Sequence, residues 1–283
     1  MTQIDAQARK EQHREDWDRA APIWRKYDES LRRGSEPLTR RLLDLAGIKL
    51  GQRVLDIASG TGEPGLSAAE IAGSSGFVLL TDQSPEMLAV ARDKARVQGL
   101  QNVEFRVCDA EQLELDQESF DAALCRGALP LMPDPPAVLR IAHAALKPGG
   151  RIAVTAGGRP EANPYFTVPY LVLRKYTTLP RYEPGAPGPL YFADPGRLSS
   201  LLADAGFREL HFETLELVPM EFESGSAYWE YSRSFWGVAS VLAQIPTDQH
   251  EKIAQEVAAL ATSGNPESTV SLTSELVLAS GVK

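Results

Sequence analysis

Residues 53–156 alternate short, continuously apolar segments with amphipathic ones, and this alternation limits the possible folds more than any other feature of the sequence. The strand-like segments are 54–57, 77–81, 103–108, 120–125 and 151–156, with helices expected over 64–72, 85–98 and 135–146. The strands are apolar along their whole length rather than at every second residue, so we expect both faces of their sheet to be covered. The repetition of strand and helix predicts an α/β fold with a doubly wound parallel sheet.

The first 50 residues read as helices that precede this unit. Trp17, Trp24 and Leu31 recur at a spacing of seven. Because proline lacks the N–H that a helix interior requires, we expect a break at Pro22 and a new helix starting there. Ser35 is expected to cap a further helix that ends at Gly47. The predicted organisation is an N-terminal helical lid over 1–50, followed by one domain over 51–283.

Two additions to that domain differ from it in composition. Residues 159–195 hold 8 of the 20 prolines and 5 of the 8 tyrosines, which predicts an insertion with a short helix near 166–176. Beyond it we expect a helix over 196–205 and a strand over 209–218. A helical addition over 224–262, with helices at 226–242 and 247–262, precedes a last strand near 271–279.

A glycine loop follows the first strand. Gly60, Gly62 and Gly65 spell GxGxxG, a pattern that by itself serves NAD, FAD and S-adenosylmethionine (SAM) alike. Asp56 favours SAM, because a carboxylate there would repel a pyrophosphate but would help a sulfonium and an ammonium. Asp82 ends the second strand and suits the two ribose hydroxyls. Asp109 ends the third strand, where its side chain or the N–H of Ala110 could bind the adenine edge.

At these residues the chain resembles class I SAM-dependent methyltransferases, in particular the small-molecule group related to the ubiquinone/menaquinone C-methyltransferases. The resemblance rests on LDIASGTG, the acid at Asp82, VCDAEQL, FDAALCRGALPLMPD and LKPGGRIAV, with WDRAAPIW near the start. It implies a Rossmann-like, seven-stranded, mostly parallel sheet with an antiparallel last strand, and SAM as cofactor with S-adenosylhomocysteine as product. Ser59 stands where the family has its first glycine, and CRGALPLMPDPP replaces the quinone enzymes' own stretch, which puts a quinone precursor in doubt. The expected cofactor-binding residues are Asp56, Ala58, Ser59, Gly60, Thr61, Gly62, Asp82, Gln83, Met87, Asp109, Ala110, Cys125, Arg126 and Trp24.

The acceptor is less constrained than the cofactor. Aromatic side chains would hold a flat apolar substrate, and the expected pocket residues are Tyr27, Tyr165, Tyr170, Tyr191, Tyr231 and Phe235. His13 is the one histidine considered as a general base. The sequence predicts methyl transfer by in-line displacement to a small, apolar or aromatic metabolite and leaves an O, C or N acceptor open. A nicotinamide-dependent oxidoreductase and a SAM-binding protein without methyl transfer are the alternatives.

Charge and cysteine content exclude other classes. The net charge of −9 argues against nucleic acid as partner, although residues 1–50 carry a balance of +2. Cys108 and Cys125 have no metal-ligand spacing, so no metal site is expected. The polar N-terminus and the absence of a long apolar run predict a cytoplasmic protein without a membrane segment, as a monomer or homodimer.

Overall fold

The computed structural model describes residues 3–179, 192 and 194–283 of the chain. Seven strands form one sheet in the order β3-β2-β1-β4-β5-β9-β6. The strands are β1 Arg53–Ile57, β2 Phe77–Asp82, β3 Val103–Val107, β4 Phe120–Arg126, β5 Leu146–Gly157, β6 Arg208–Leu217 and β9 Ser274–Val282. β9 is antiparallel to both β5 and β6, whereas the pairs among β1 to β5 are parallel. The predicted sheet is therefore confirmed, including its antiparallel last strand.

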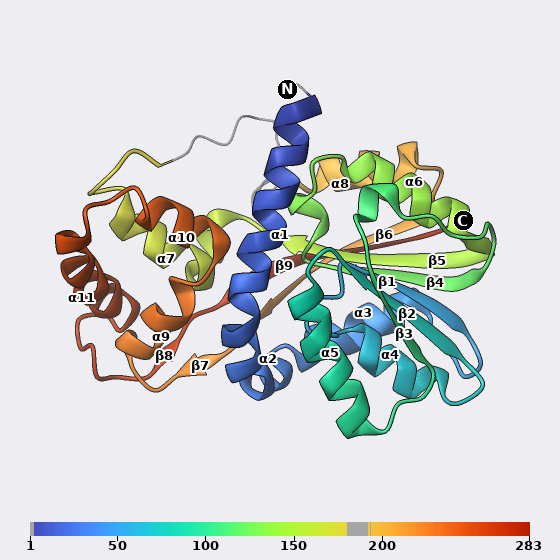
Figure 1. Ribbon diagram of the computed structural model, residues 1–283, viewed down its shortest axis with the longest axis horizontal. Helices are drawn as coiled ribbons and strands as arrows, with labels where there is room; N and C mark the ends of the chain where they lie inside the picture. The colour runs from blue at the N-terminus through green and yellow to red at the C-terminus, as the bar shows by residue number, and fades with distance from the viewer. Residues whose placement is uncertain (1–2, 180–191, 193) are drawn as a thin grey trace.

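Helices cover both faces of the sheet (Figure 1). The expectation of apolar strands is wrong for β3, which carries Glu104 and Arg106 and lies at one edge of the sheet. On one face α3 Glu36–Ala46, α4 Gly65–Ala72 and α5 Pro85–Gln98 bury a core that includes Leu42, Leu66 and Leu80. On the other face α6 Pro135–Ala145 and α8 Pro195–Asp204 bury a second core that includes Leu139 and Leu198. Short 3-10 turns lie at Ala110–Gln112, Leu129–Leu131, Pro160–Ala162 and Thr247–Gln249.

The strand order places the site. From β1 the sheet extends through β2 and β3 in one direction and through β4 and β5 in the other. Ligands of doubly wound sheets bind beyond the carboxyl ends of the strands at such a reversal. The segments that follow β1, β2, β3 and β4 therefore converge on one edge.

A separate group of elements, which we call the helical lobe, lies to one side of the sheet (Figure 1). It comprises α7 Pro164–Leu173, α9 Gly225–Ser232, α10 Trp236–Leu242, α11 His250–Ala261, β7 Glu221–Phe222 and β8 Val270–Ser271. These elements share one apolar core, with Val172, Tyr228 and Ile253 fully buried. Helix α7 of the insertion thus packs against the helical addition, although 51 residues lie between the end of α7 and the start of α9.

Two expectations about the N-terminal helices are wrong. Helix α1 runs unbroken over Gln3–Lys26 with Pro22 inside it, and the chain breaks at Tyr27 before α2 Asp28–Gly34. Continuity places Trp17 and Trp24 on one face, where their rings meet edge to face at 6.1 Å. Ser35 precedes α3 but gives it no side-chain cap, because its hydroxyl donates backwards to the Leu31 carbonyl at 2.6 Å.

Two further boundaries differ near the C-terminus. The helix expected over 226–242 is split into α9 and α10, because Phe235 adopts an extended backbone, φ −59° and ψ 130°, between them. The strand expected over 271–279 is divided as well. β8 pairs with β7 in a small separate sheet, and β9 enters the main sheet only from Ser274. None of the described helices is long and apolar enough to cross a membrane.

Candidate functional site

The loop between β1 and α4 forms the floor of the candidate site. Its backbone turns through positive φ at Ala58 (55°), Gly60 (53°) and Gly62 (107°). The Ser59 N–H donates to the Thr81 carbonyl at 2.8 Å, which ties the loop to the end of β2. At Gly60 a Cβ would have no atom within 4 Å, so the loop presents bare backbone to open space there. Such a turn lets a flat nucleoside approach the main chain closely.

Asp56 lies behind this loop and is fully buried. Its Oδ2 accepts the Gly65 N–H at 2.8 Å, and a Cβ on residue 65 would come within 2.5 Å of the same oxygen. Burial raises the pKa of Asp56 well above its usual range, and the Gly65 bond opposes this only in part. Within the described residues, Asp56 Oδ1 and Ser59 Oγ are buried without a hydrogen-bond partner. Buried polar atoms seldom lack a partner in native proteins, and a ligand bound at this loop would supply one.

Asp82 joins the glycine loop to the start of α5. One carboxylate oxygen accepts the Gly60 N–H and the other accepts the Ser84 N–H, both at 2.8 Å. Burial raises the pKa of Asp82 to about 6, although the bonds from the Ser84 and Gly60 amides favour the charged form. The carboxylate thus lies beside the exposed backbone of the loop, at the edge where the sequence predicted ribose binding.

Asp109 and Ala110 follow β3 at the same edge. Asp109 Oδ1 accepts the Glu111 N–H at 2.9 Å, and Oδ2 binds Lys10 Nζ of α1 at 2.7 Å. Lys10 also pairs with Glu111. Burial alone would lower the pKa of Lys10, but its bonds to these two acids raise it. The position expected to bind the adenine edge is therefore bridged to the N-terminal helix.

The end of β4 completes the edge. Cys125 is buried, and burial raises the pKa of its thiol to about 12, while that of Cys108 is raised to about 11 for the same reason. Neither sulfur is a thiolate at neutral pH, so neither is a nucleophile. Arg126 turns towards α3, where its Nη1 donates to the Thr39 hydroxyl at 2.9 Å.

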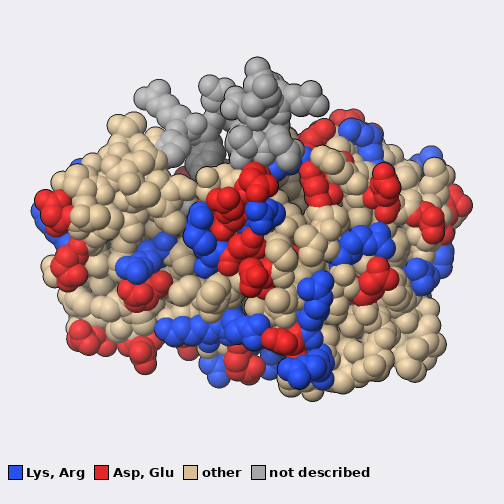
Figure 2. Space-filling model, in the orientation of Figure 1, with Lys and Arg blue, Asp and Glu red and all other residues tan. Residues whose placement is uncertain are grey.

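Helix α1 lies across this edge, between the sheet and the helical lobe, and contacts both α5 and α10 (Figure 1). Met87 of α5 is buried against Ala20 and Ala21, with Trp17 and Trp24 partly buried beside them. Asp18 accepts the Ser84 hydroxyl at 2.5 Å, directly after Asp82. Charged side chains of both signs gather on the face shown in Figure 2. Along α1, Arg14 pairs with both Glu11 and Asp18.

The sequence reasoning missed Lys10, Asp18 and Ser84 as parts of this edge. A signal was present for Lys10, because it lies seven residues before Trp17 and so extends the same helical stripe. His13 lies on α1 as well and is half-buried. Nothing comparable marked Asp18, whose partner is 66 residues away in sequence.

Four of the aromatic residues expected around the acceptor form one group with Phe222, which the sequence did not single out. We call this group, Tyr27, Tyr165, Phe222, Tyr231 and Phe235, the aromatic cluster. Tyr231 is at its centre, with ring centroids 5.2 Å from Tyr27, 5.4 Å from Phe222 and 5.0 Å from Phe235. Tyr170 is partly buried against the same core, and Tyr191 lies outside the described residues. The members of the cluster therefore come from segments far apart in sequence: the residue before α2, α7, β7, α9 and the residue before α10.

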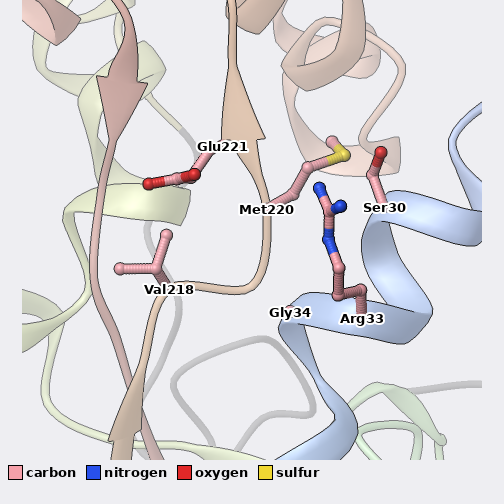
Figure 3. A pocket seen from close by; sticks show the side chains of 6 residues that line it. All are labelled: Ser30, Arg33, Gly34, Val218, Met220 and Glu221. Carbon is pink, nitrogen blue, oxygen red and sulfur yellow. The ribbon is translucent and has the colours of Figure 1, made fainter.

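A cavity of about 220 Å³ lies elsewhere, between α2 and the segment joining β6 to β7 (Figure 3). Its lining residues are Ser30, Arg33, Gly34, Val218, Met220 and Glu221. None of them belongs to the glycine loop or to the acids at the strand ends. In the part of the chain that is described, no group of three His, Cys, Asp or Glu side chains could hold a metal ion.

Comparison with known proteins agrees with this geometry. A family model described as a methyltransferase domain matches residues 48–166. The ubiquinone/menaquinone biosynthesis C-methyltransferase UbiE of Cellvibrio japonicus is 31% identical over 186 residues, covering 62% of this chain and 75% of that protein. The solved structure of YcgJ from Bacillus subtilis is 18% identical, with a TM-score of 0.57, covering 87% of this chain and 97% of that one.

A third comparison concerns the cofactor. Phosphoethanolamine N-methyltransferase 2 of Haemonchus contortus, solved with phosphomonomethylethanolamine and S-adenosylhomocysteine, is 20% identical. Its TM-score is 0.52, and the match covers 87% of this chain and 52% of that one. At this identity the likeness is one of fold.

Fold and site together define a SAM-dependent methyltransferase of the Rossmann-like class. The chain belongs to the methyltransferase family that includes the ubiquinone/menaquinone C-methyltransferases. The residues present fit SAM, since the loop offers open backbone at Gly60 and buried unpartnered oxygens at Asp56 and Ser59. The nicotinamide-dependent alternative is not supported by these relatives.

Proposed function

We propose that the protein methylates a small, apolar or aromatic metabolite. The observation that carries this proposal is the aromatic cluster, whose Tyr231 lies within electrostatic range of Arg126 at the end of β4. Aromatic side chains offer a large apolar contact area to a flat ligand. The net charge of −9 also suits a small acceptor better than a nucleic acid backbone.

In this proposal each strand end binds one part of the cofactor. Asp82 accepts the ribose hydroxyls, and Asp109 or the Ala110 N–H binds the adenine edge. Ala58, Ser59, Gly60, Thr61 and Gly62 supply main-chain groups, with Gln83, Met87, Cys125 and Trp24 around them, while Arg126 lies beyond them at the end of β4. Bound SAM supplies an activated methyl group on a sulfonium, so the protein's main task is to align the acceptor and exclude water.

The N-terminal helices act as the lid that excludes this water. Lys10 bridges to Asp109 and Glu111, and Asp18 binds Ser84, so α1 is held at both ends of the acidic edge. His13 on the same helix is proposed as the base for an acceptor that must lose a proton. An acidic acceptor needs no such base.

A labelled-methyl experiment tests the proposal. The protein is incubated with SAM carrying a radiolabelled methyl group and with small metabolites extracted from cells, and labelled products are identified by mass. We expect label in a compound of low molecular mass. Label found only in RNA or protein, with none in the metabolite fraction, would overturn the proposal.

A further inference from the structure

Arg126 occupies a position that the proposed reaction has to use. It is the last residue of β4, which pairs with β1, and β1 leads directly into the glycine loop. Its guanidinium therefore lies at the carboxyl edge of the two central strands. Asp28, Asp56 and Glu63 lie close enough to favour its charge, as does Tyr231.

The guanidinium has more donors than partners. Among the described residues its hydrogen bond goes to one neutral group, the Thr39 hydroxyl at 2.9 Å, and no carboxylate forms an ion pair with it. Burial is the main effect on the pKa of Arg126 and lowers it. A guanidinium presents five N–H groups in a planar fork that matches a carboxylate, and a buried cation gains most from an anion that fills that fork.

Two phenols extend the same site. Tyr231 is buried, with Arg126 within electrostatic range of its hydroxyl. The hydroxyl of Tyr165 is buried without a well-aligned hydrogen bond, and Tyr231 is its neighbour. The ring centroids of these two tyrosines are 6.2 Å apart. A partly buried cation thus lies within electrostatic range of a buried phenol at one end of an otherwise apolar cluster.

From this arrangement we infer that the methyl acceptor is an aromatic or other flat compound that carries a carboxylate, bound by the Arg126 guanidinium with the Tyr231 hydroxyl as a second donor. This inference rests on the proposed small-molecule function and narrows its substrate class. Arg126 then selects acids over neutral compounds of the same shape. SAM has a carboxylate of its own, so the test has to distinguish the two sources.

The first arm measures acceptor binding to the protein saturated with S-adenosylhomocysteine. Benzoate and benzamide have the same ring and nearly the same shape, but only benzoate is charged. We expect wild-type protein to bind benzoate about tenfold or more tightly than benzamide, because hydrogen bonds to a charged group are the strong ones. Arg126→Met should abolish the preference and Arg126→Lys should keep part of it. Arg140→Met, an exposed arginine of α6, should keep all of it.

The second arm measures the cofactor by calorimetry. S-adenosylhomocysteine carries the amino-acid carboxylate and 5′-methylthioadenosine lacks it. If Arg126 binds the acceptor, Arg126→Met leaves the affinity for both nearly unchanged. A tenfold loss for S-adenosylhomocysteine alone would assign Arg126 to the cofactor's carboxylate and overturn the inference.

A second pair of variants keeps the test decisive should Arg126→Met fail to fold. Tyr231→Phe removes only the proposed second donor and should reduce the benzoate preference about threefold. Tyr228→Phe is its matched control, a buried phenol of α9 whose hydroxyl donates to the Tyr165 carbonyl at 2.9 Å. Equal binding of benzoate and benzamide by the wild type would also overturn the inference. The proposed function is tested by a different experiment, and it fails if no metabolite gains a labelled methyl group from SAM.

Discussion

Asp82 is the residue that joins the two halves of the proposed cofactor site. Its carboxylate accepts amide protons from Gly60 in the loop after β1 and from Ser84 at the start of α5. Both bonds use the ionised form, yet burial raises the pKa of Asp82 to about 6. The side chain therefore titrates within an accessible pH range while it holds the loop in place.

The raised pKa predicts a pH-dependent affinity. Two ribose hydroxyls bind an ionised carboxylate more strongly than a protonated one, so the affinity for S-adenosylhomocysteine should fall, by at most about tenfold per pH unit, as Asp82 takes up a proton below about pH 6. In the unliganded protein, the stability of the fold changes with pH in the opposite direction to this affinity. Since the native state holds this proton longer than the unfolded chain, Asp82 makes the fold less stable as pH rises from about 4 to about 6.

Calorimetric titration from pH 5 to 7.5 checks the binding part of this prediction. Asp82→Asn keeps the shape of the side chain and removes its titration, so its affinity should be low and nearly flat over this range. A wild-type affinity that does not change between pH 5 and 7 would contradict the assignment of Asp82.

Gly60 allows a test of where the cofactor lies. Gly60 and Gly99 both have positive φ, 53° and 71°, and at each a Cβ would meet nothing within 4 Å. Changing either to alanine should lower stability by about 1 kcal/mol, from backbone strain alone. Only Gly60→Ala should also lower the affinity for S-adenosylhomocysteine, by about tenfold, because the methyl group of the new alanine fills the space beside the loop. Equal affinities for the two variants would place the cofactor elsewhere.

The sequence predicts that the acids at the strand ends lie together, but it does not predict which residues they bind. Asp56, Asp82 and Asp109 each end an apolar strand, and parallel strands bring such ends together. The bonds they make come from elsewhere, as with Lys10, which is 99 residues from Asp109. Periodicity within one segment cannot reveal such a pairing.

Among the elements, α1 departs most from what local rules predict. Proline removes one helical hydrogen bond and favours a break, but the packing of Trp17, Ala21 and Trp24 against α5 keeps the helix continuous past Pro22. The opposite error occurred at 226–242, where an apolar pattern without proline is interrupted before Trp236. Tertiary contacts outweighed the local preference at Pro22, and single-sequence propensities do not contain such contacts.

Helix α1 also predicts a kinetic effect. If it closes over the cofactor, Lys10→Met removes a part-buried bridge to Asp109 and Glu111 and should speed dissociation of S-adenosylhomocysteine about fivefold. Stopped-flow tryptophan fluorescence follows this rate, since Trp17 and Trp24 lie on the same helix.

The matched control is Arg19→Met. Arg19 is more exposed than Lys10 and pairs only with Glu15 and Asp16 of its own helix, so the dissociation rate should stay unchanged. Faster release from both variants would indicate general loosening of α1 rather than a role for the bridge.

At the scale of the whole molecule, the sheet and the helical lobe have separate apolar cores, and α1 contacts an element of each. A ligand bound at the edge between them should stabilise the chain as a unit. With S-adenosylhomocysteine at 100 times its Kd, the free energy of unfolding rises by about 2.7 kcal/mol. For a chain of this size the melting temperature should rise by about 5–10 °C.

Scanning calorimetry checks this prediction, with NADH as the control ligand. The chain belongs to a family of SAM-dependent methyltransferases, so NADH should leave the melting temperature unchanged. Two transitions, of which the ligand raises only one, would show that sheet and lobe unfold independently.

The order of strands has a consequence for synthesis on the ribosome. In the main sheet β6 pairs with β9 alone, and β9 is the last of the described strands to be made. At about 5–20 residues per second, β6 waits roughly 3 to 13 seconds for its partner. During that time its unpaired edge, and the free edge of β5, are exposed to other chains. Newly made protein should therefore depend on chaperones most during translation of residues 218–282.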